Sequence, residues 1–472
     1  ARLDYWMNTS VRWSLVAWLF LCVGLFLGGW WAFDVLGWGG YWAWDPVENA
    51  AFLPWLTGTA FLHSVMIQEK RGMMRRWNVI LVILTYLLVI FGTFATRSGF
   101  VSSVHSFAQS AIGPLFFVFL AGAVIASVAV VINKWDTLQA DNELEHIVSR
   151  ETAFLLNNVV FTAIALTVFV GTYWSVFTEI LSGFTPVERS TLGPAYFNRS
   201  TGPMFVVLLF LMGVAPLIAW KKASIKRLGK AIVLPVAGTL VTVTVLGVLG
   251  VRQPGALIGL GMAIFAGLVT AFEIGRGAQA RIRTHDENVV QAVWTLFGRN
   301  RRRYGGYLTH FGVVIIAIGI IASSAYQLET QQPLSAGQTI TLGDYVLEYN
   351  TIERFIATDG RAVTRAVTTV FHNGNEIGQI IPRVDNYPNG QPMSIPGKLM
   401  SPLGDDFYVL LVSWEPVSMS SATFKVYYNP LVNWIWGGSL VLMLGTFVTA
   451  WPDTKPVKIR QPSRRTAPAA GD

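Results

Sequence analysis

The stretch Trp38–Leu56 reads WGGYWAWDPVENAAFLPWL, and the rest of the chain is interpreted outward from it. It joins two apolar segments and combines four tryptophans with two glycines, two prolines and three polar side chains. With Trp30 and Trp31 upstream, six of the eighteen tryptophans fall within 26 residues. A belt of aromatic rings at the lipid headgroup level explains part of this pattern. A flat aromatic shelf for a large planar ligand also explains the ordered glycines, prolines and polar side chains.

The composition is that of a membrane protein with several spans. The chain has 472 residues, of which 53% are hydrophobic and 13% charged, and its mean hydropathy is +0.48. The net charge of +8 therefore indicates basic loops on the cytoplasmic side and not nucleic-acid binding. Cys22 is the one cysteine, so the chain can form neither an internal disulfide nor a Cys-X-X-Cys centre. Any thiol chemistry must belong to a partner.

Ten segments are apolar and long enough to cross a hydrocarbon core of about 30 Å at about 1.5 Å per residue. Loops rich in Lys and Arg alternate with loops that are poor in them, and the positive-inside rule places the basic set in the cytoplasm. The tryptophan-rich stretch then faces outward. The predicted spans are 12–33, 50–68, 78–96, 113–133, 153–173, 203–220, 231–250, 255–273, 306–325 and 431–451.

Residues 326–430 differ from the rest of the chain. Polar and apolar residues alternate there, and His372-Asn373-Gly374 and Pro388-Asn389-Gly390 are turn signals. The predicted fold is an all-α polytopic membrane protein of about ten transmembrane helices, with a small β-rich extracytoplasmic domain inserted before the last helix. Its parts are a helical region (1–325) with the aromatic shelf (37–56), a periplasmic β domain (326–430), a final helix (431–451) and a basic cytoplasmic tail (452–472).

Two histidines lie inside predicted spans, where an ionisable side chain is costly and is a functional candidate. The alternative is a neutral imidazole bonded to a carbonyl of a neighbouring helix. His63 follows Glu48 by 15 residues, about 22 Å of helix, and His310 follows Arg303 by seven, about 10 Å. Counted from opposite sides of a core of about 30 Å, the two depths nearly coincide. The two imidazoles are therefore placed to ligate one haem iron from opposite faces.

The runs WDPVEN (Trp44–Asn49) and PWL (Pro54–Leu56) resemble the "WWD" signature of the haem-handling proteins of cytochrome c maturation, and most closely its CcmF branch. That family usually has Trp and Phe where this chain has Tyr41 and Ala43. The resemblance implies that His63 and His310 are the axial ligands of a resident haem b. It also implies that His105, in an outward loop, ligates the iron of the haem to be transferred.

The same resemblance implies further site residues. Trp38, Trp42, Trp44 and Tyr41 would hold the transferred haem, and Arg97 would meet a propionate. Asp45, Glu48 and Asn49 would either orient propionates or shape the turn, and repulsion between carboxylates favours the second for the two acids. The family also carries an outward histidine before the shelf, whereas no histidine precedes His63 here. We therefore expect the chain to lack an N-terminal part.

The implied function is that of a cytochrome c haem lyase subunit in the cytoplasmic (inner) membrane of a bacterium, with its active surface on the periplasmic side. The implied partners are haem, a haem-delivering chaperone, an apocytochrome c with its thiol-reducing and presenting partners, and the lipid bilayer. A quinol is a candidate electron donor to the resident haem, and no nucleic acid is expected. The alternatives are a haem exporter or chaperone without ligation activity, and a membrane transporter, which predicts inverted repeats.

Overall fold

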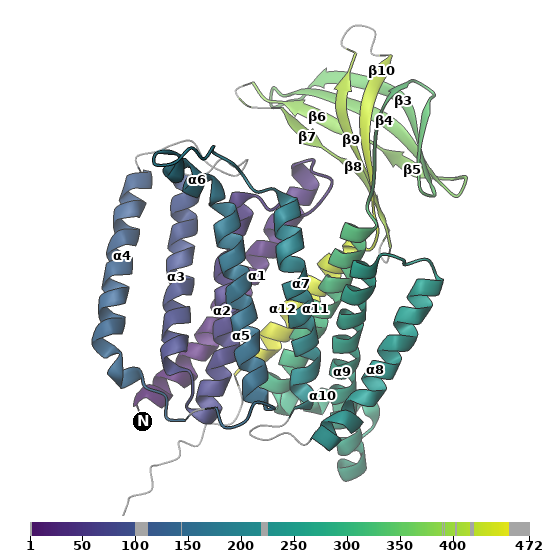
Figure 1. Ribbon diagram of the computed structural model, residues 1–472. Helices are drawn as coiled ribbons and strands as arrows, with labels where there is room; N and C mark the ends of the chain where they lie inside the picture. Colours follow the sequence, from purple (N-terminus) through teal and green to yellow (C-terminus); the bar gives the residue numbers. More distant parts are fainter. Residues whose placement is uncertain are drawn as a thin grey trace, which may run out of the picture.

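The computed structural model describes residues 2–99, 112–142, 144–218, 225–388, 390, 392–401, 404–415 and 420–452. Within this part of the chain, ten helices are long and apolar enough to cross a membrane, which confirms the ten predicted spans. Figure 1 shows them as one bundle with a β domain beyond one end. The spanning helices are α1 (Arg2–Val35), α2 (Pro46–Arg71), α3 (Arg75–Arg97), α4 (Ile112–Lys134), α5 (Arg150–Thr172), α7 (Pro194–Val214), α8 (Ile225–Val248), α9 (Pro254–His285), α11 (Arg301–Ala325) and α12 (Val432–Ala450).

Two further helices were not predicted from the sequence. The first, α6 (Trp174–Ser182), follows α5, and the second, α10 (Val289–Arg299), lies between α9 and α11. The apolar side chains Val289, Val290 and Trp294 of α10 are exposed, and the helix begins with a capping box at Asn288. Such a short helix with one exposed apolar face suits the membrane–water interface. Two 3₁₀ turns, η1 (Asp136–Leu138) and η2 (Ala215–Leu217), complete the helical elements.

Local sequence signals set the ends of the spanning helices. Ser149 accepts a hydrogen bond from the backbone N–H of Thr152 and so caps the first turn of α5. Gly72 ends α2 in the left-handed conformation, with φ of +67°, which a residue without a Cβ atom adopts without strain. Pro254 occupies the first turn of α9, where its missing N–H costs nothing.

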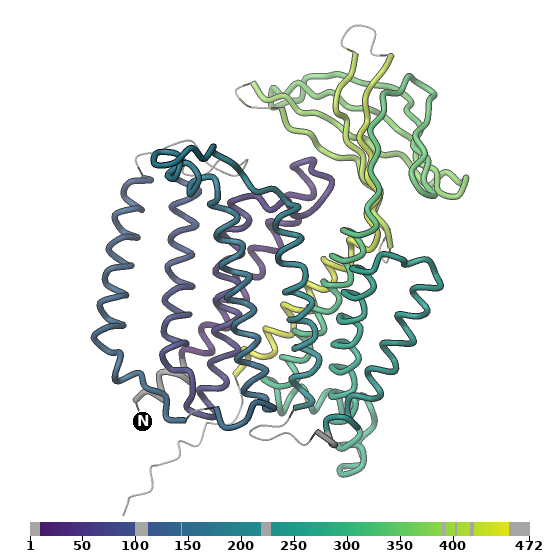
Figure 2. Tube along the Cα trace, viewed as in Figure 1, coloured from purple at the N-terminus to yellow at the C-terminus, as the bar shows by residue number. Residues whose placement is uncertain are grey.

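The helices α11 and α12 pack against each other more closely than ordinary side chains permit. A methyl group added at Gly312, Gly438 or Gly445 would overlap the backbone of the facing helix. Small residues at such positions let two transmembrane helices approach and gain van der Waals contact along their length. Figure 2 shows that α1 and α12, the first and last spans, run obliquely through the bundle. They contact each other through Trp18, Cys22 and Leu442.

The β domain consists of two sheets. One sheet has the strand order β1-β10-β9-β8, and the other has the order β2-β3-β4-β6-β7 with β5 paired to β4. Buried side chains from both sheets, such as Leu347, Phe407 and Phe424, form one shared core. The strands are β1 (Leu328–Ser335), β2 (Thr339–Leu342), β3 (Tyr345–Ile356), β4 (Ala362–His372), β5 (Asn375–Ile380), β6 (Arg383–Asn386), β7 (Met393–Ile395), β8 (Gly397–Met400), β9 (Asp406–Trp414) and β10 (Ser421–Asn429). The predicted β-rich insertion before the last helix is therefore confirmed.

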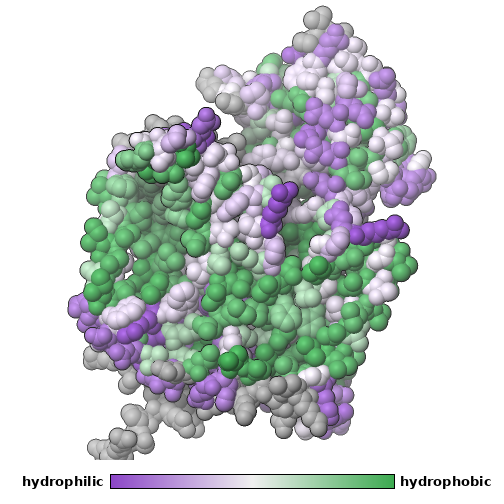
Figure 3. Space-filling view, in the orientation of Figure 1, coloured by the Kyte–Doolittle hydropathy of each residue, from purple (hydrophilic) through white to green (hydrophobic). Residues whose placement is uncertain are grey.

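The two ends of the bundle carry different features. We call the end with residues 36–45, α6 and the β domain the tryptophan end, and the end with the α2–α3 turn and α10 the basic end (Figure 1). Figure 3 shows an apolar belt between more polar regions at the two ends. Ion pairs join different helices at the basic end: Arg71 with Glu151, Arg302 with Glu69 and Arg303 with Glu273. Which end faces the cytoplasm stays a prediction from the positive-inside rule.

Candidate functional site

The tryptophan-rich stretch forms a tight loop between α1 and α2, followed by the first turns of α2. The loop residues Gly37, Gly39 and Trp44 all have positive φ, of 67°, 73° and 57°. A methyl group at Gly39 would overlap the ring of Tyr427, so the loop backbone lies directly against β10. The glycines of this stretch are therefore needed both for the turn and for its contact with the β domain.

Asp45 and Glu48 hydrogen-bond to the chain's own backbone. Asp45 Oδ1 accepts from the N–H of Val47 at 2.9 Å, and the Glu48 carboxylate accepts from the N–H groups of Ala43 and Asp45 at 3.0 and 3.1 Å. Together these contacts form a capping box at the start of α2. The interpretation that the two acids fix the loop is confirmed. Asp45 thus caps α2, and its role in haem transfer stays a prediction.

Trp44 is held by residues from two other helices. Its ring stacks on Phe197, with ring centroids 4.9 Å apart and planes at 9°, and its Nε1 donates to Asn198 Oδ1 at 2.8 Å. The buried Asn49 donates from Nδ2 to the carbonyl of Trp44 at 3.0 Å and to Thr172 Oγ1 at 2.9 Å. Phe197 and Asn198 begin α7, and no local motif in the sequence marks them as partners of this tryptophan.

The aromatic side chains do not form the flat shelf that the sequence suggested. The rings of Trp42 and Trp44 meet edge to face at 89°, and Trp42 meets Phe52 at 71°. One face of Trp44 is already covered by Phe197. The physical reason is that the face of an aromatic ring is negative and its edge positive, so packed neighbours adopt edge-to-face or offset-stacked contacts and do not form one continuous plane. The cluster offers edges and single ring faces, all of them half-buried.

Tyr41 packs apart from Trp42 and Trp44. Its hydroxyl lies 3.3 Å from Ser323 Oγ on α11, and its ring meets Trp436 of α12 edge to face at 6.2 Å. Trp38, also half-buried, lies in the same loop. The loop therefore contacts both halves of the bundle.

His63 and His310 come together in the interior of the helical region. Their ring centroids are 6.1 Å apart and their planes differ by 6°. His63 lies on α2 and His310 on α11, and both side chains are partly accessible. The ring of His63 also neighbours Phe154 and Phe161 of α5, at 6.0 and 6.1 Å. The two rings therefore lie at a common depth, as the sequence predicted.

The geometry of the pair fits two axial ligands of one haem. His63 Nδ1 lies 2.8 Å from the carbonyl of Thr59, which fixes the ring and leaves Nε2 for another partner. An imidazole–metal bond is about 2 Å long, so two ligands on opposite sides of one ion bring their ring centres to about 6 Å. Near-parallel ring planes are compatible with both nitrogens pointing at that ion. Among the described helices, α2 packs on α1, α3 and α5, and α11 on α9 and α12, but these two do not pack closely on each other.

Comparisons with known proteins identify the family of the chain. A family model described as cytochrome C assembly protein matches residues 1–101. The cytochrome c-type biogenesis protein CcmF of Pseudomonas aeruginosa is 33% identical over 475 residues, which cover 100% of this chain and 69% of that protein. The chain belongs to the CcmF family. The Escherichia coli protein of the same name is 28% identical over 470 residues, covering 99% of this chain and 69% of that one.

A solved structure named cytochrome c heme lyase CcmF shares the fold, with a TM-score of 0.74 and 27% identity. The match covers 95% of this chain and 67% of that one, so this CcmF-family chain spans about two thirds of the length of these relatives. Together with its ten apolar helices, these relatives make it a multi-pass protein of the bacterial inner membrane.

Of the remaining predicted site residues, Arg97 lies within the described part of the chain and His105 does not. Arg97 ends α3 at the tryptophan end and is exposed. His105 lies outside the described residues. His146 and His285 are exposed, and His372 stacks on Tyr345 with ring centroids 4.4 Å apart, so these three histidines lie apart from the pair. Among the described residues, no group of three or more His, Cys, Asp or Glu side chains could hold a separate metal ion.

A buried carboxyl group lies where the β domain meets the tryptophan-rich loop. Asp406 of β9 is fully buried, and Asn429 stands opposite it on β10. Burial raises the pKa of Asp406 to about 7, while the nearby Lys398 and Asn429 oppose that rise. Lys398 in turn pairs with Asp34 near the end of α1. This junction between the β domain and α1 is one that sequence patterns alone do not reveal.

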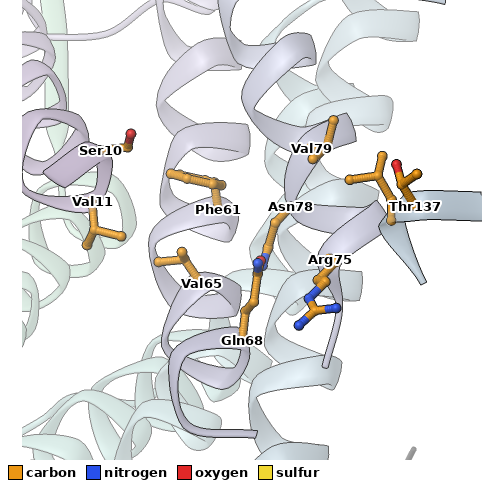
Figure 4. A pocket seen from close by; sticks show the side chains of 10 residues that line it. Ser10, Val11, Phe61, Val65, Gln68, Arg75, Asn78, Val79 and Thr137 are labelled. Atoms are coloured by element: carbon orange, nitrogen blue, oxygen red, sulfur yellow. The ribbon is translucent and has the colours of Figure 1, made fainter. Parts of the chain in front are cut away.

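Figure 4 shows a small, mostly apolar pocket at the basic end of α1, α2 and α3. Phe61, Val65, Gln68 and Asn78 are among its lining residues. Phe61 and Val65 lie on α2 on either side of His63 in sequence. The other residues that line the pocket come mainly from α1 and α3, whereas His63 faces α5 and α11. The pocket is therefore separate from the histidine pair.

Proposed function

We propose that this chain acts in cytochrome c maturation as a haem lyase subunit, with a resident haem b held between His63 and His310. The observation that carries the proposal is the pair of near-parallel imidazoles, 6.1 Å apart, in a chain of the CcmF family. Intramembrane histidines are costly unless they have partners, and a bis-imidazole haem site provides one partner for both. When bound, that haem supplies one-electron chemistry.

The second haem is the substrate, and we place it at the tryptophan end. Trp38, Trp42 and Trp44, with Tyr41 across the loop, would contact its macrocycle, and His105 would ligate its iron. The exposed guanidinium of Arg97 is on the same end and suits a propionate. The capping box of Asp45 and Glu48 holds these rings in place before the substrate arrives, and such preorganisation lowers the cost of binding.

The chemistry needs little more than positioning. Each thiol of a Cys-X-X-Cys-His segment adds across one haem vinyl group: the sulfur bonds to one vinyl carbon, and a proton reaches the other. No electrons are gained or lost, so the thiols must arrive reduced and no oxidant is consumed. Holding both reactants in register converts a bimolecular step into an effectively unimolecular one. Cys22 is buried between α1 and α2 and accepts a hydrogen bond from Trp55, so it takes no part.

The proposed orientation in the membrane follows from the different features of the two ends of the bundle. The tryptophan end would face the periplasm, where a chaperone delivers haem and an apocytochrome c is presented by its thiol-reducing partners. The basic end would face the cytoplasm. His63 and His310 lie nearer the basic end, which suits electron transfer outward to keep the transferred iron ferrous, with a quinol as the candidate donor.

The test is co-expression of the full-length protein with an apocytochrome c in cells without their own lyase. We expect covalent haem on the cytochrome, detected by haem staining of denaturing gels, and a pyridine haemochrome of haem b from the purified protein. A protein that retains its bound haem but yields no covalent cytochrome would instead be a haem exporter or chaperone. A protein without any haem spectrum would favour the alternative of a membrane transporter.

A further inference from the structure

A cluster of charged and polar side chains on α11 and α9 lies toward the basic end from His310. Arg303 and Tyr307 lie on α11 seven and three residues before His310, so all three share one face of the helix. Arg303 Nη2 donates to Glu273 Oε2 on α9 at 3.0 Å, and Arg303 Nε donates to the Tyr307 hydroxyl at 3.2 Å. Tyr307 donates to the same Glu273 oxygen at 3.4 Å.

The partner of these groups is an almost fully buried carboxylate. Glu273 is 1% exposed, whereas the side chains of Arg303 and Arg276, which both bind it, are 55% and 58% exposed. A buried carboxylate needs charged partners, because its desolvation is otherwise costly. One carboxylate shared by two guanidinium groups leaves an excess of positive charge. Within the described part of the chain, Arg303 Nη1 has no hydrogen-bond partner, so the arginine can bind a second anion.

Helix α5, which neighbours His63, also carries an arginine. Arg150 lies four residues before Phe154 on α5, and Phe154 neighbours the ring of His63. Its guanidinium donates to the carbonyls of Ala215, Pro216 and Ile218, which fixes it at the end of α7. Arg150 is close enough to Tyr307, Arg303 and Glu273 for their charges to act on it. Arg303 therefore lies on the basic-end side of His310, and Arg150 lies on the basic-end side of His63.

We infer that Arg303 binds a propionate of the resident haem, with Tyr307 and Glu273 as positioning residues and Arg150 contributing positive charge from the opposite side. The inference rests on the proposed function, because it requires a haem between His63 and His310. The seven residues from Arg303 to His310 span about 10 Å of helix, which suits the separation of a haem iron from its propionate carboxylates. The cluster thus directs both propionates toward the basic end and fixes which edge of the macrocycle faces the tryptophan end.

The discriminating experiment compares haem with haem dimethyl ester, in which both propionates are neutral. The full-length protein, stripped of haem and placed in nanodiscs of neutral lipid, is titrated with each ligand while the low-spin bis-imidazole absorption is recorded. We expect the wild-type protein to bind haem about tenfold or more tightly than the ester, since a charge-assisted hydrogen bond contributes that much. Arg303→Gln should reduce this preference to about twofold or less, and Arg303→Lys should restore part of it.

The matched control is Arg301→Gln on the same helix. Arg301 donates to the carbonyl of Pro452 at 2.6 Å, so this change removes the same charge but not the proposed contact. An unchanged preference in Arg303→Gln, an equal loss in Arg301→Gln, or a wild-type protein that does not distinguish haem from its ester would each overturn the inference. In all three cases the bis-imidazole spectrum would persist and the proposed function would stand. Absence of that spectrum from the wild-type protein would defeat both.

Discussion

The tryptophan end and the basic end of this bundle use polar side chains in opposite ways. At the tryptophan end, Asp45, Glu48 and Asn49 hydrogen-bond to the loop backbone, and half-buried aromatic rings pack around this loop. At the basic end, Glu69, Glu151 and Glu273 each pair with an arginine. One end is shaped by caps and ring contacts, and the other is held by charge.

The proposed function requires the two ends to hold haem in two different ways. Aromatic faces and edges bind a planar molecule through area, without the desolvation penalty of charged groups, and so permit release. Ion pairs and metal bonds in an apolar setting hold a ligand that stays. We therefore expect changes at the basic end to affect the resident haem and changes at the tryptophan end to affect transfer.

The largest expected effect comes from changes to the histidine pair. If these changes did not affect the resident haem, the proposed difference between the two ends would be wrong. His63→Ala or His310→Ala should each remove the low-spin bis-imidazole spectrum and lower bound haem more than about tenfold, because one ligand cannot replace two. Absorption spectroscopy of the purified variants measures this directly. His285→Ala, at an exposed position, is the control and should leave the spectrum unchanged. Retention of the spectrum in both pair variants would place the resident haem elsewhere.

The second effect concerns the β-domain side of the tryptophan end and depends on pH. Because burial raises the pKa of Asp406 from 3.8 to about 7, the folded protein keeps this proton at pH values where the unfolded chain has released it. Wild-type stability should therefore fall as the pH rises from about 4 to about 7 and remain low above that.

Asp406→Asn removes this penalty, so the variant should gain up to ~4 kcal/mol over the wild-type protein at pH 8 and almost nothing at pH 4. Thermal unfolding in detergent at both pH values checks the prediction. Asp405→Asn, one residue away, is the comparison variant, because it changes the same type of side chain at a position that is only half-buried. A gain for Asp406→Asn that is equal at both pH values would rule out a titrating carboxyl group.

A third change sharpens the contrast between the two ends. Trp44→Ala removes the stacking contact with Phe197 and the hydrogen bond to Asn198, so it should cost ~2 kcal/mol of stability. The yield of covalent cytochrome should drop several-fold while the bis-imidazole spectrum stays unchanged. Trp294→Ala on α10, with a ring that is 82% exposed, is the matched tryptophan control. Equal loss of the resident haem and of transfer in Trp44→Ala would mean that the two ends act as one site.

The smallest effect tests the loop cap. Asp45→Ala should cost ~1 kcal/mol, because it removes the oxygen that caps α2, whereas Asp45→Asn should cost only a few tenths because asparagine also caps. Thermal unfolding of the two variants, together with the yield of covalent cytochrome, measures both consequences. A fall in cytochrome yield that is as large in Asp45→Asn as in Asp45→Ala would show that the charge, and not the cap, matters.

The sequence predicted most of the helical architecture and the meeting of the two histidines. Both follow from one-dimensional quantities: a span is a length of apolar residues, and the depth of His63 or His310 is a count of residues from the nearest polar end. The acids of the tryptophan-rich loop were also interpretable, since a capping box is a local pattern over four residues.

The contacts that the sequence could not predict are those between distant segments. Trp44 stacks on Phe197 because α7 packs on α5, which also packs on α2, and Glu273 meets Arg303 because α9 packs on α11. The angle between two rings likewise depends on the surrounding packing, which is why the expected flat shelf is an edge-to-face cluster. The role of His105 stays a prediction, because that residue lies outside the described part of the chain.

The glycine contact between α11 and α12 has a mechanical consequence. Strands β1 and β10, which pair along their whole length, continue directly from α11 and into α12. Because no side chains separate the two helices at Gly312, Gly438 and Gly445, we expect this assembly to move as one rigid unit. A protein that docks on the β domain and tilts it would tilt His310 with it, while His63 stays with α2 and its neighbours. Partner binding at the β domain would thereby change the distance between the two histidines that we propose as haem ligands.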